Sequence, residues 1–128
     1  MADGSAAGPQ HVLIVEDEPA LAELYGETVR AAGFRCTVTL SVGEALRLLR
    51  RERPDLVVTD MLFPAGIDGV RVLAAARKLR LPFVAMTGSA EAIDDLERAG
   101  VPYLRKPFLN VELLNAIHNE LEHKASLR

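Results

Sequence analysis

Short apolar runs alternate with longer segments in which apolar residues recur every three or four positions. The runs predict strands buried on both faces, because they are rich in β-branched and other apolar residues. They lie at residues 12–15, 34–40, 56–59, 83–86 and 103–104. The longer segments predict amphipathic helices. They begin near residues 19, 41, 68, 90 and 107. This alternation predicts an α/β fold, a parallel sheet with helices on both faces.

Local signals support several helix boundaries. Pro19 is typical of a first helical turn, and Gly33 is typical of the position just past a helix end. Ser41 and Glu44 have the spacing of a capping box, in which each side chain bonds the backbone of the other residue. Pro54 stands where the second helix should stop. These signals agree with the periodicity, and the order of strand followed by helix holds along the chain.

The chain has the length of one domain. Its 128 residues suffice for one well-covered core and are too few for two ordinary domains. The first ten, MADGSAAGPQ, are small and carry no apolar pattern, which predicts a flexible tail at 1–10. We therefore expect the folded domain at 11–123 and a C-terminal tail at 124–128.

Composition narrows the class of function. A net charge of −3 and a pI near 5.6 give no electrostatic reason to expect contact with nucleic acid or an anionic membrane. We therefore expect a protein or a small ion as partner, and no direct nucleic-acid binding. No apolar stretch approaches the roughly 18 residues of a membrane span, and no signal-peptide pattern is visible, so we expect a cytoplasmic location. Cys36 stands alone, which excludes a disulfide framework and a thiolate metal site.

Polar residues stand at the ends of the predicted strands. Glu16 and Asp17 follow the first strand, Asp60 the third, Thr87 the fourth and Lys106 the fifth. The carboxyl ends of parallel strands share one edge of the sheet, so these side chains should converge in a crevice there. Carboxylates brought together repel each other unless a cation lies among them. Ligands that are all oxygen, with no His or Cys, favour Mg²⁺.

Thr87 and Lys106 make the set more specific. A lysine ammonium is a point charge suited to phosphoryl oxygens, and a threonine hydroxyl can donate to another. The pocket therefore resembles one that is built for a phosphoryl group on a carboxylate, with Asp60 as the nucleophile. A carboxylate suffices because phosphoryl transfer demands positioning and charge stabilisation more than covalent work from the protein. The product would be a labile acyl phosphate.

Four motifs in order carry a family resemblance. VLIVEDEP, VVTDMLFP followed by DG, VAMTGSA and YLRKPF together resemble the receiver domain of two-component response regulators, over residues 11 to about 122. The resemblance implies a flavodoxin-like, five-stranded parallel sheet of strand order 2-1-3-4-5. It also implies a phosphorylation switch that promotes only its own phosphorylation and dephosphorylation.

The resemblance assigns a metal site. It implies Glu16 and Asp17 as the acid pair for Mg²⁺, with Asp17 favoured as the direct ligand and Glu16 acting through water. Asp60 would be both phosphoacceptor and ligand, and the backbone carbonyl of Leu62 a further ligand.

The resemblance also implies switch residues and partners. Thr87 would follow the phosphoryl group, Lys106 would be its counter-charge, and Tyr103 would report the change by rotating. Lys106-Pro107 is a cis peptide in the family. The implied partners are a histidine kinase or histidine phosphotransfer protein as donor and a downstream protein as target, with a phosphorylation-dependent dimer possible. Either a stand-alone regulator or the receiver of a longer protein fits.

The chain departs from the family pattern in three places. One additional residue lies between Pro64 and the Asp68-Gly69 pair, and the segment from Thr87 to Lys106 is shorter than in many members, which predicts a trimmed or reoriented helix there. Leu62 stands where family side chains border the path of the hydrolytic water, and an apolar side chain cannot orient that water.

The same residues also have simpler structural interpretations. Acids ahead of Pro19, including Glu16, Asp17 and Glu18, often serve as helix caps or first-turn charges. His11, His118 and His123 have no partners at metal-ligand spacing, and we interpret them as surface or edge residues.

Three other functions were compared with the switch. A flavodoxin-like cofactor binder is disfavoured, because the acids after the first strand would repel a phosphate. A phosphatase of the haloacid dehalogenase type needs a second acid two residues after the nucleophile, where this chain has Leu62. A receiver-fold interaction module that works without phosphorylation stays open.

Overall fold

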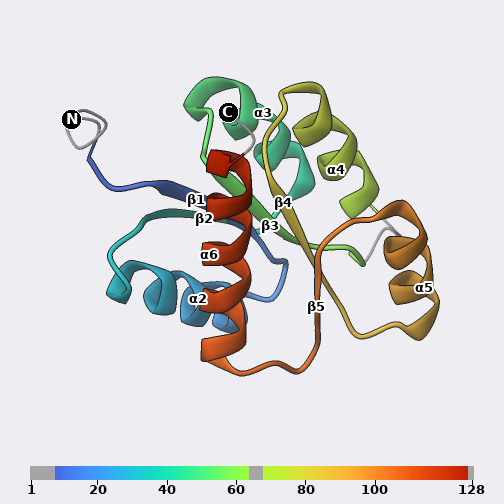
Figure 1. Ribbon diagram of the computed structural model, residues 1–128. Coiled ribbons are helices and arrows are strands. Elements are labelled where there is room, and N and C mark those ends of the chain that lie inside the picture. Colours follow the sequence, from blue (N-terminus) through green and yellow to red (C-terminus); the bar gives the residue numbers. More distant parts are fainter. Residues whose placement is uncertain (1–7, 64–67, 127–128) are drawn as a thin grey trace.

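The computed structural model describes residues 8–63 and 68–126 (Figure 1). Its sheet contains five parallel strands in the order β2-β1-β3-β4-β5. They are β1 (His11–Val15), β2 (Arg35–Thr39), β3 (Leu56–Asp60), β4 (Phe83–Thr87) and β5 (Tyr103–Arg105). The predicted flavodoxin-like architecture and strand order are therefore confirmed.

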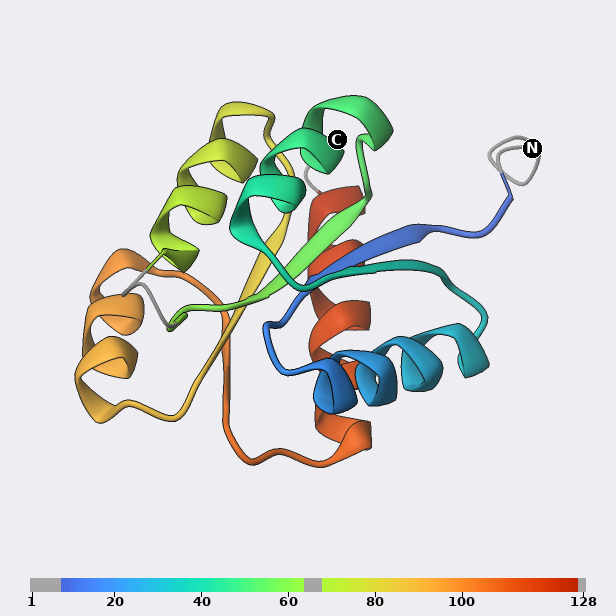
Figure 2. The ribbon, with the colours of Figure 1, turned by 180° about the vertical axis from the view of Figure 1, so that it is seen from behind.

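Helices cover both faces of this sheet (Figures 1 and 2). They are α2 (Pro19–Ala31), α3 (Val42–Glu52), α4 (Gly69–Lys78), α5 (Ala90–Ala99) and α6 (Asn110–Ser126). One face packs on α2 and α6, and the other packs on α3 and α4, while α5 lies beside β5. Among residues 8–63 and 68–126, no helix is long and apolar enough to cross a membrane.

Alternation along the strands builds the two cores. In β1, Val12 and Ile14 face the core under α2 and α6, whereas Leu13 and Val15 face the core under α3 and α4. All of these side chains are buried because a parallel sheet with helices on both faces leaves its central strands no solvent side. The central strands therefore hold their carboxyl ends rigidly at one edge.

The helix starts match the sequence signals with one difference. Ser41 caps α3 by accepting a hydrogen bond from the Glu44 N–H at 3.1 Å. The Glu44 carboxylate does not close a full capping box but accepts from the Thr39 hydroxyl at 2.6 Å. Thr39 is the last residue of β2, and this contact therefore joins the end of the edge strand to the helix that follows it.

Candidate functional site

The sheet brings the five predicted polar residues to one edge. Glu16 and Asp17 directly follow β1, Asp60 and Thr87 are the last residues of β3 and β4, and Lys106 follows β5. β1 and β3 are neighbours at the centre of the sheet, the point where the winding of a doubly wound sheet reverses and ligand crevices form. Their closeness follows from topology, because Glu16 and Lys106 are 90 positions apart in sequence.

Lys106 connects the acidic residues. Its Nζ donates to Glu16 Oε1 at 2.6 Å and to Asp60 Oδ2 at 2.9 Å. Glu16 is 1% exposed and Asp60 is 7% exposed. A buried carboxylate is tolerated where it is paired and hydrogen-bonded, and β3 can therefore end in the charged residue Asp60.

Burial and pairing shift the pKa values in opposite ways at this site. Burial raises the pKa of Glu16, and the hydrogen bond from Lys106 opposes that rise. Burial alone would lower the pKa of Lys106, but its hydrogen bonds to Glu16 and Asp60 outweigh burial and raise it. Lys106 is therefore a fixed positive charge at neutral pH, which is the form needed to meet phosphoryl oxygens.

Three carboxylates fit a hard cation. One oxygen from each of Glu16, Asp17 and Asp60 lies within 4.8 Å of the other two. Within the described residues this is the one group of three or more acidic, His or Cys side chains with such spacing. An all-oxygen set that leaves coordination positions open to water and phosphate suits Mg²⁺.

Leu62 contacts the acceptor through its backbone. Its N–H donates to Asp60 Oδ1 at 3.2 Å, so the two oxygens of Asp60 have different partners. The Leu62 side chain is 58% exposed and lines an open hollow. The other residues that line this hollow are Asp60, Thr87, Gly88, Ser89 and Lys106. The metal-ligand role implied for the Leu62 carbonyl stays a prediction.

Thr87 lies at the start of the turn into α5. Its hydroxyl oxygen accepts from the Ser89 N–H at 3.1 Å, and its carbonyl accepts from the Lys106 N–H at 2.8 Å. Ser89 caps α5 by accepting from the Ala92 N–H at 3.2 Å. A movement of the Thr87 hydroxyl would therefore disturb a turn that is directly joined to α5.

The hydroxyl of Tyr103 has its hydrogen-bond partner on α5 in this conformation. Its hydroxyl donates to Glu97 Oε2 at 2.8 Å, and this hydrogen bond, more than burial, raises the pKa of Tyr103. Tyr103 is thereby bonded to α5. The switch role given to Tyr103 and Thr87 is untested by the geometry of one state.

Sequence reasoning noted Gly69 only as part of a motif and missed its contact with the acceptor. A Cβ atom on Gly69 would lie 2.5 Å from Met61 Cα and 2.6 Å from the Asp60 carbonyl oxygen. Real Cβ atoms do not approach backbone so closely, and α4 can therefore start against the acceptor strand only with glycine at this position. The signal in the sequence was a glycine at a predicted helix start, where no turn requires one.

Two simpler readings fare differently. Glu18 is the N-cap residue of α2 but makes no side-chain capping bond. Glu16 accepts from the Glu18 N–H at 3.2 Å as well as from Lys106, so it stabilises the local turn before α2 and also belongs to the charged site.

His11 is 5% exposed and its Nε2 bonds the Thr37 hydroxyl at 2.7 Å. Its interpretation as a surface or edge residue is therefore wrong.

Other expectations have mixed outcomes. The peptide Lys106-Pro107 is cis, as the resemblance implied. The loop with the additional residue lies at 64–67, outside the described residues. The helix α5 has ten residues, and its trimming relative to the family stays a prediction.

The lone Cys36 has a pKa raised to about 11 by burial, and its thiol is therefore protonated and unreactive at neutral pH.

Fold and site together define a class of protein: a flavodoxin-like α/β domain with an acidic crevice and one lysine at the carboxyl edge of its sheet. A family model described as the response regulator receiver domain matches residues 12–118. The chain belongs to this family, whose members are signalling domains rather than classical enzymes.

Curated relatives and solved structures agree with that membership. The DNA-binding response regulator MtrA of Mycolicibacterium smegmatis is 36% identical over 117 residues, covering 88% of this chain and 50% of MtrA. A CheY-like receiver domain protein from Methanospirillum hungatei has a TM-score of 0.84 at 25% identity, over 94% of this chain and 100% of that one. A putative response regulator from Chloroflexus aurantiacus has a TM-score of 0.79 at 33% identity, over 89% and 98%.

These relatives correct the expected partners. The prediction of no direct nucleic-acid binding is wrong for the family, because MtrA is by name a DNA-binding response regulator. The transcriptional regulatory protein GlrR of Escherichia coli, 30% identical over 122 residues, is matched over 27% of its length. This chain spans about half the length of the MtrA relatives and less of GlrR. The net charge, from which we predicted no nucleic-acid binding, is thus a property of the receiver domain alone.

Proposed function

We propose that this domain accepts a phosphoryl group on Asp60, with Mg²⁺ bound by Glu16, Asp17 and Asp60, and thereby changes its affinity for another protein. The observation that carries the proposal is the placement of Lys106. Its ammonium bonds both Glu16 and Asp60, so a fixed positive charge lies beside the carboxylate that would receive phosphate. The open hollow at Asp60 supplies access.

The transfer step is a simple exchange of bonds. A carboxylate oxygen of Asp60 forms a bond to phosphorus while the bond from phosphorus to the donor breaks, and the bonding electrons leave with the donor. The donor would be a phosphohistidine on a kinase or phosphotransfer protein, or a small acyl phosphate. When bound, Mg²⁺ would neutralise charge on the phosphoryl oxygens.

The chain's own residues would do the positioning. The Leu62 N–H holds one oxygen of Asp60, and Lys106 would move from bridging two carboxylates to meeting a phosphoryl oxygen. Thr87, at the end of the neighbouring strand, would turn its hydroxyl to another oxygen and release the Ser89 N–H. Because Ser89 caps α5, this turn couples the site to α5.

The proposed location is the cytoplasm. The domain has one cysteine, Cys36, and therefore no disulfide within it, which fits a reducing compartment. The downstream target would be another protein, whose binding changes when Asp60 is phosphorylated.

The direct test is intact mass after incubation with acetyl phosphate, with and without Mg²⁺. The wild-type chain should gain one phosphoryl group only with Mg²⁺, and Asp60→Asn should gain none. Asp94→Asn, an exposed aspartate on α5, is the matched control and should behave as wild type. No gain in a folded, Mg²⁺-binding protein would favour the interaction module that works without phosphorylation.

A further inference from the structure

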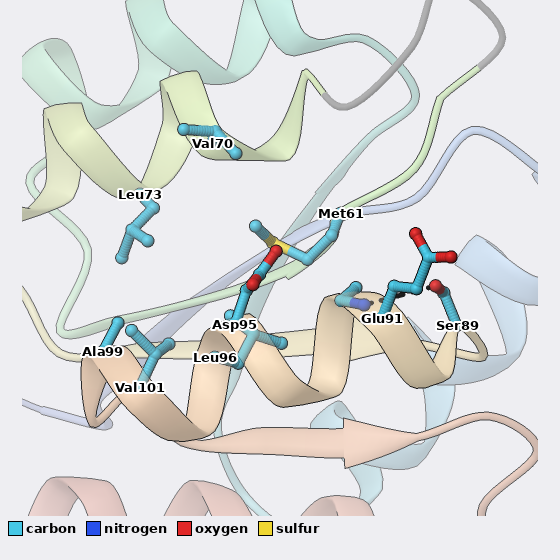
Figure 3. A pocket seen from close by; sticks show the side chains of 10 residues that line it. Met61, Val70, Leu73, Ser89, Glu91, Asp95, Leu96, Ala99 and Val101 are labelled. Carbon is cyan, nitrogen blue, oxygen red and sulfur yellow. Dashed lines mark hydrogen bonds between the residues drawn. The ribbon is translucent and has the colours of Figure 1, made fainter.

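A cavity of about 250 Å³ lies between α4 and α5, next to the hollow at Asp60, with which it shares the lining residue Ser89. Figure 3 shows Val70 and Leu73 on the α4 side and Asp95 and Leu96 on the α5 side. The lining is mainly apolar. It consists of Met61, Val70, Leu73, Ser89, Glu91, Ala92, Asp95, Leu96, Ala99 and Val101.

The size of the cavity bounds its occupant. An apolar cavity of roughly 150 Å³ in a protein core can bind benzene. The cavity between α4 and α5 is larger and partly open, so it has room for a ring or a branched aliphatic group with a short chain attached. Met61 and Leu96, each about 5% exposed or less, form a fixed floor against which such a group would bury its surface.

The charge of the lining selects one kind of ligand. Glu91 and Asp95 lie one helical turn apart on α5, and none of the ten lining residues is basic. Asp95 pairs with Arg98 at 3.7 Å, but both side chains are largely exposed, and an exposed ion pair of this kind contributes little. An ammonium group at the cavity mouth would therefore be attracted, and a carboxylate repelled.

We propose that the cavity between α4 and α5 is a binding site for a small organic cation, an apolar group of about ring size that carries a primary amine. The apolar group would lie on Met61, Leu73 and Leu96, and the ammonium would bond Glu91 and Asp95. No phosphoryl group takes part, so this site can be tested whether or not Asp60 is phosphorylated.

Methionine methyl signals offer a clean readout. The chain has Met1, Met61 and Met86, and of the two methionines within the described residues only Met61 lines the cavity. Met86 is fully buried in the core under α2 and α6 and serves as an internal control. With ¹³C-methyl methionine in the wild-type chain, phenethylamine should shift the Met61 signal saturably and leave Met86 in place. The shape-matched acid 3-phenylpropionate should bind at least about tenfold more weakly.

Variants separate charge from shape. Glu91→Gln with Asp95→Asn should reduce the preference for the amine to within about twofold. Glu23→Gln with Glu27→Gln removes two exposed acids at the same spacing on α2 and should leave the preference unchanged. Ala92→Leu, which fills the cavity, should abolish the shift with either probe, while an unchanged Met86 signal would show that the fold is intact.

Three results would overturn the proposal. One is the absence of a saturable Met61 shift with phenethylamine. Another is equal affinity for the amine and the acid. The third is an undiminished preference for the amine after Glu91 and Asp95 are neutralised, which would show that these carboxylates do not recognise the ligand.

Discussion

Gly69 shows how a residue without a side chain helps to define the acceptor site. Its backbone N–H donates to the Met61 carbonyl at 3.2 Å, and its missing Cβ lets α4 begin against the backbone of Asp60 and Met61. Side-chain chemistry alone does not describe this site, because the position of the Asp60 carboxylate depends on that close approach.

Gly69→Ala should therefore cost stability as well as function. A methyl group forced against backbone at 2.5 Å must displace α4 or β3, at a cost of about 1–3 kcal/mol. Gly43→Ala is the matched control, since its Cβ would meet nothing within 4 Å and alanine favours a helix by up to about 1 kcal/mol. Urea unfolding measures both. Equal stability of Gly69→Ala and wild type would show that the contact is dispensable.

His11 should make stability depend on pH. Burial, and after it the charge of Arg35, lowers the pKa of His11 from 6.5. The unfolded chain then binds a proton near pH 6.5 that the folded chain refuses, so the unfolding free energy should fall as pH drops below about 6.5. His11→Gln should lose this part of the pH dependence. Urea unfolding at pH 7.5 and 5.5 tests this prediction. If the unfolding free energy falls by the same amount between these pH values in wild type and in His11→Gln, the prediction is contradicted.

Leu62 should lengthen the life of an acyl phosphate on Asp60. Its side chain is 58% exposed beside the acceptor and offers no polar group to orient an attacking water. Leu62→Asn should therefore speed loss of the phosphoryl group by about threefold or more, since an oriented water reacts faster. Leu24→Asn, on exposed α2 surface, is the control. Decay followed by intact mass, after acetyl phosphate is removed by desalting into buffer that contains Mg²⁺, would decide, and equal decay rates for Leu62→Asn and wild type would contradict this prediction.

At the scale of elements, the pattern of the sequence was sufficient for the sheet. Continuous apolar runs such as VLIV and LVV can be buried only in a sheet covered on both faces. Because the strands of such a sheet are parallel, Asp60 and Thr87 at their carboxyl ends lie at the same edge. The hydrophobic pattern could not predict side-chain contacts between different elements, because these contacts depend on how the helices pack on the sheet. Examples are the bond from Tyr103 to Glu97 and the bond from Thr39 to Glu44.

The bond between β5 and α5 gives a measurable property. Because hydrogen bonding to the Glu97 carboxylate is the main cause that raises the pKa of Tyr103, Glu97→Gln should lower that pKa. The pKa of Tyr25, raised mainly by burial, should stay unchanged. Titration of ¹³C-labelled tyrosine by NMR resolves the two. If phosphorylation draws Tyr103 away from α5, it should have the same effect as Glu97→Gln, and an unmoved Tyr103 pKa would argue against its switch role.

At the scale of the whole molecule, charge was a weaker guide than topology. The net charge of −3 suggested partners without nucleic acid, yet the MtrA relative is named a DNA-binding protein of about twice the matched length. Net charge reports on the surface of the domain at hand. The strand order, by contrast, places Glu16, Asp60 and Lys106 together whatever the rest of a longer protein contains.

Chemical mapping can identify the residue that carries the phosphoryl group, which we propose is Asp60. The protein is incubated with acetyl phosphate and Mg²⁺, then treated with borohydride, which reduces an acyl phosphate of aspartate to homoserine, and its peptides are sequenced by mass spectrometry. We expect homoserine at position 60 only when both acetyl phosphate and Mg²⁺ are present. Homoserine at position 17, or a phosphoryl group retained on another residue with position 60 unchanged, would contradict it.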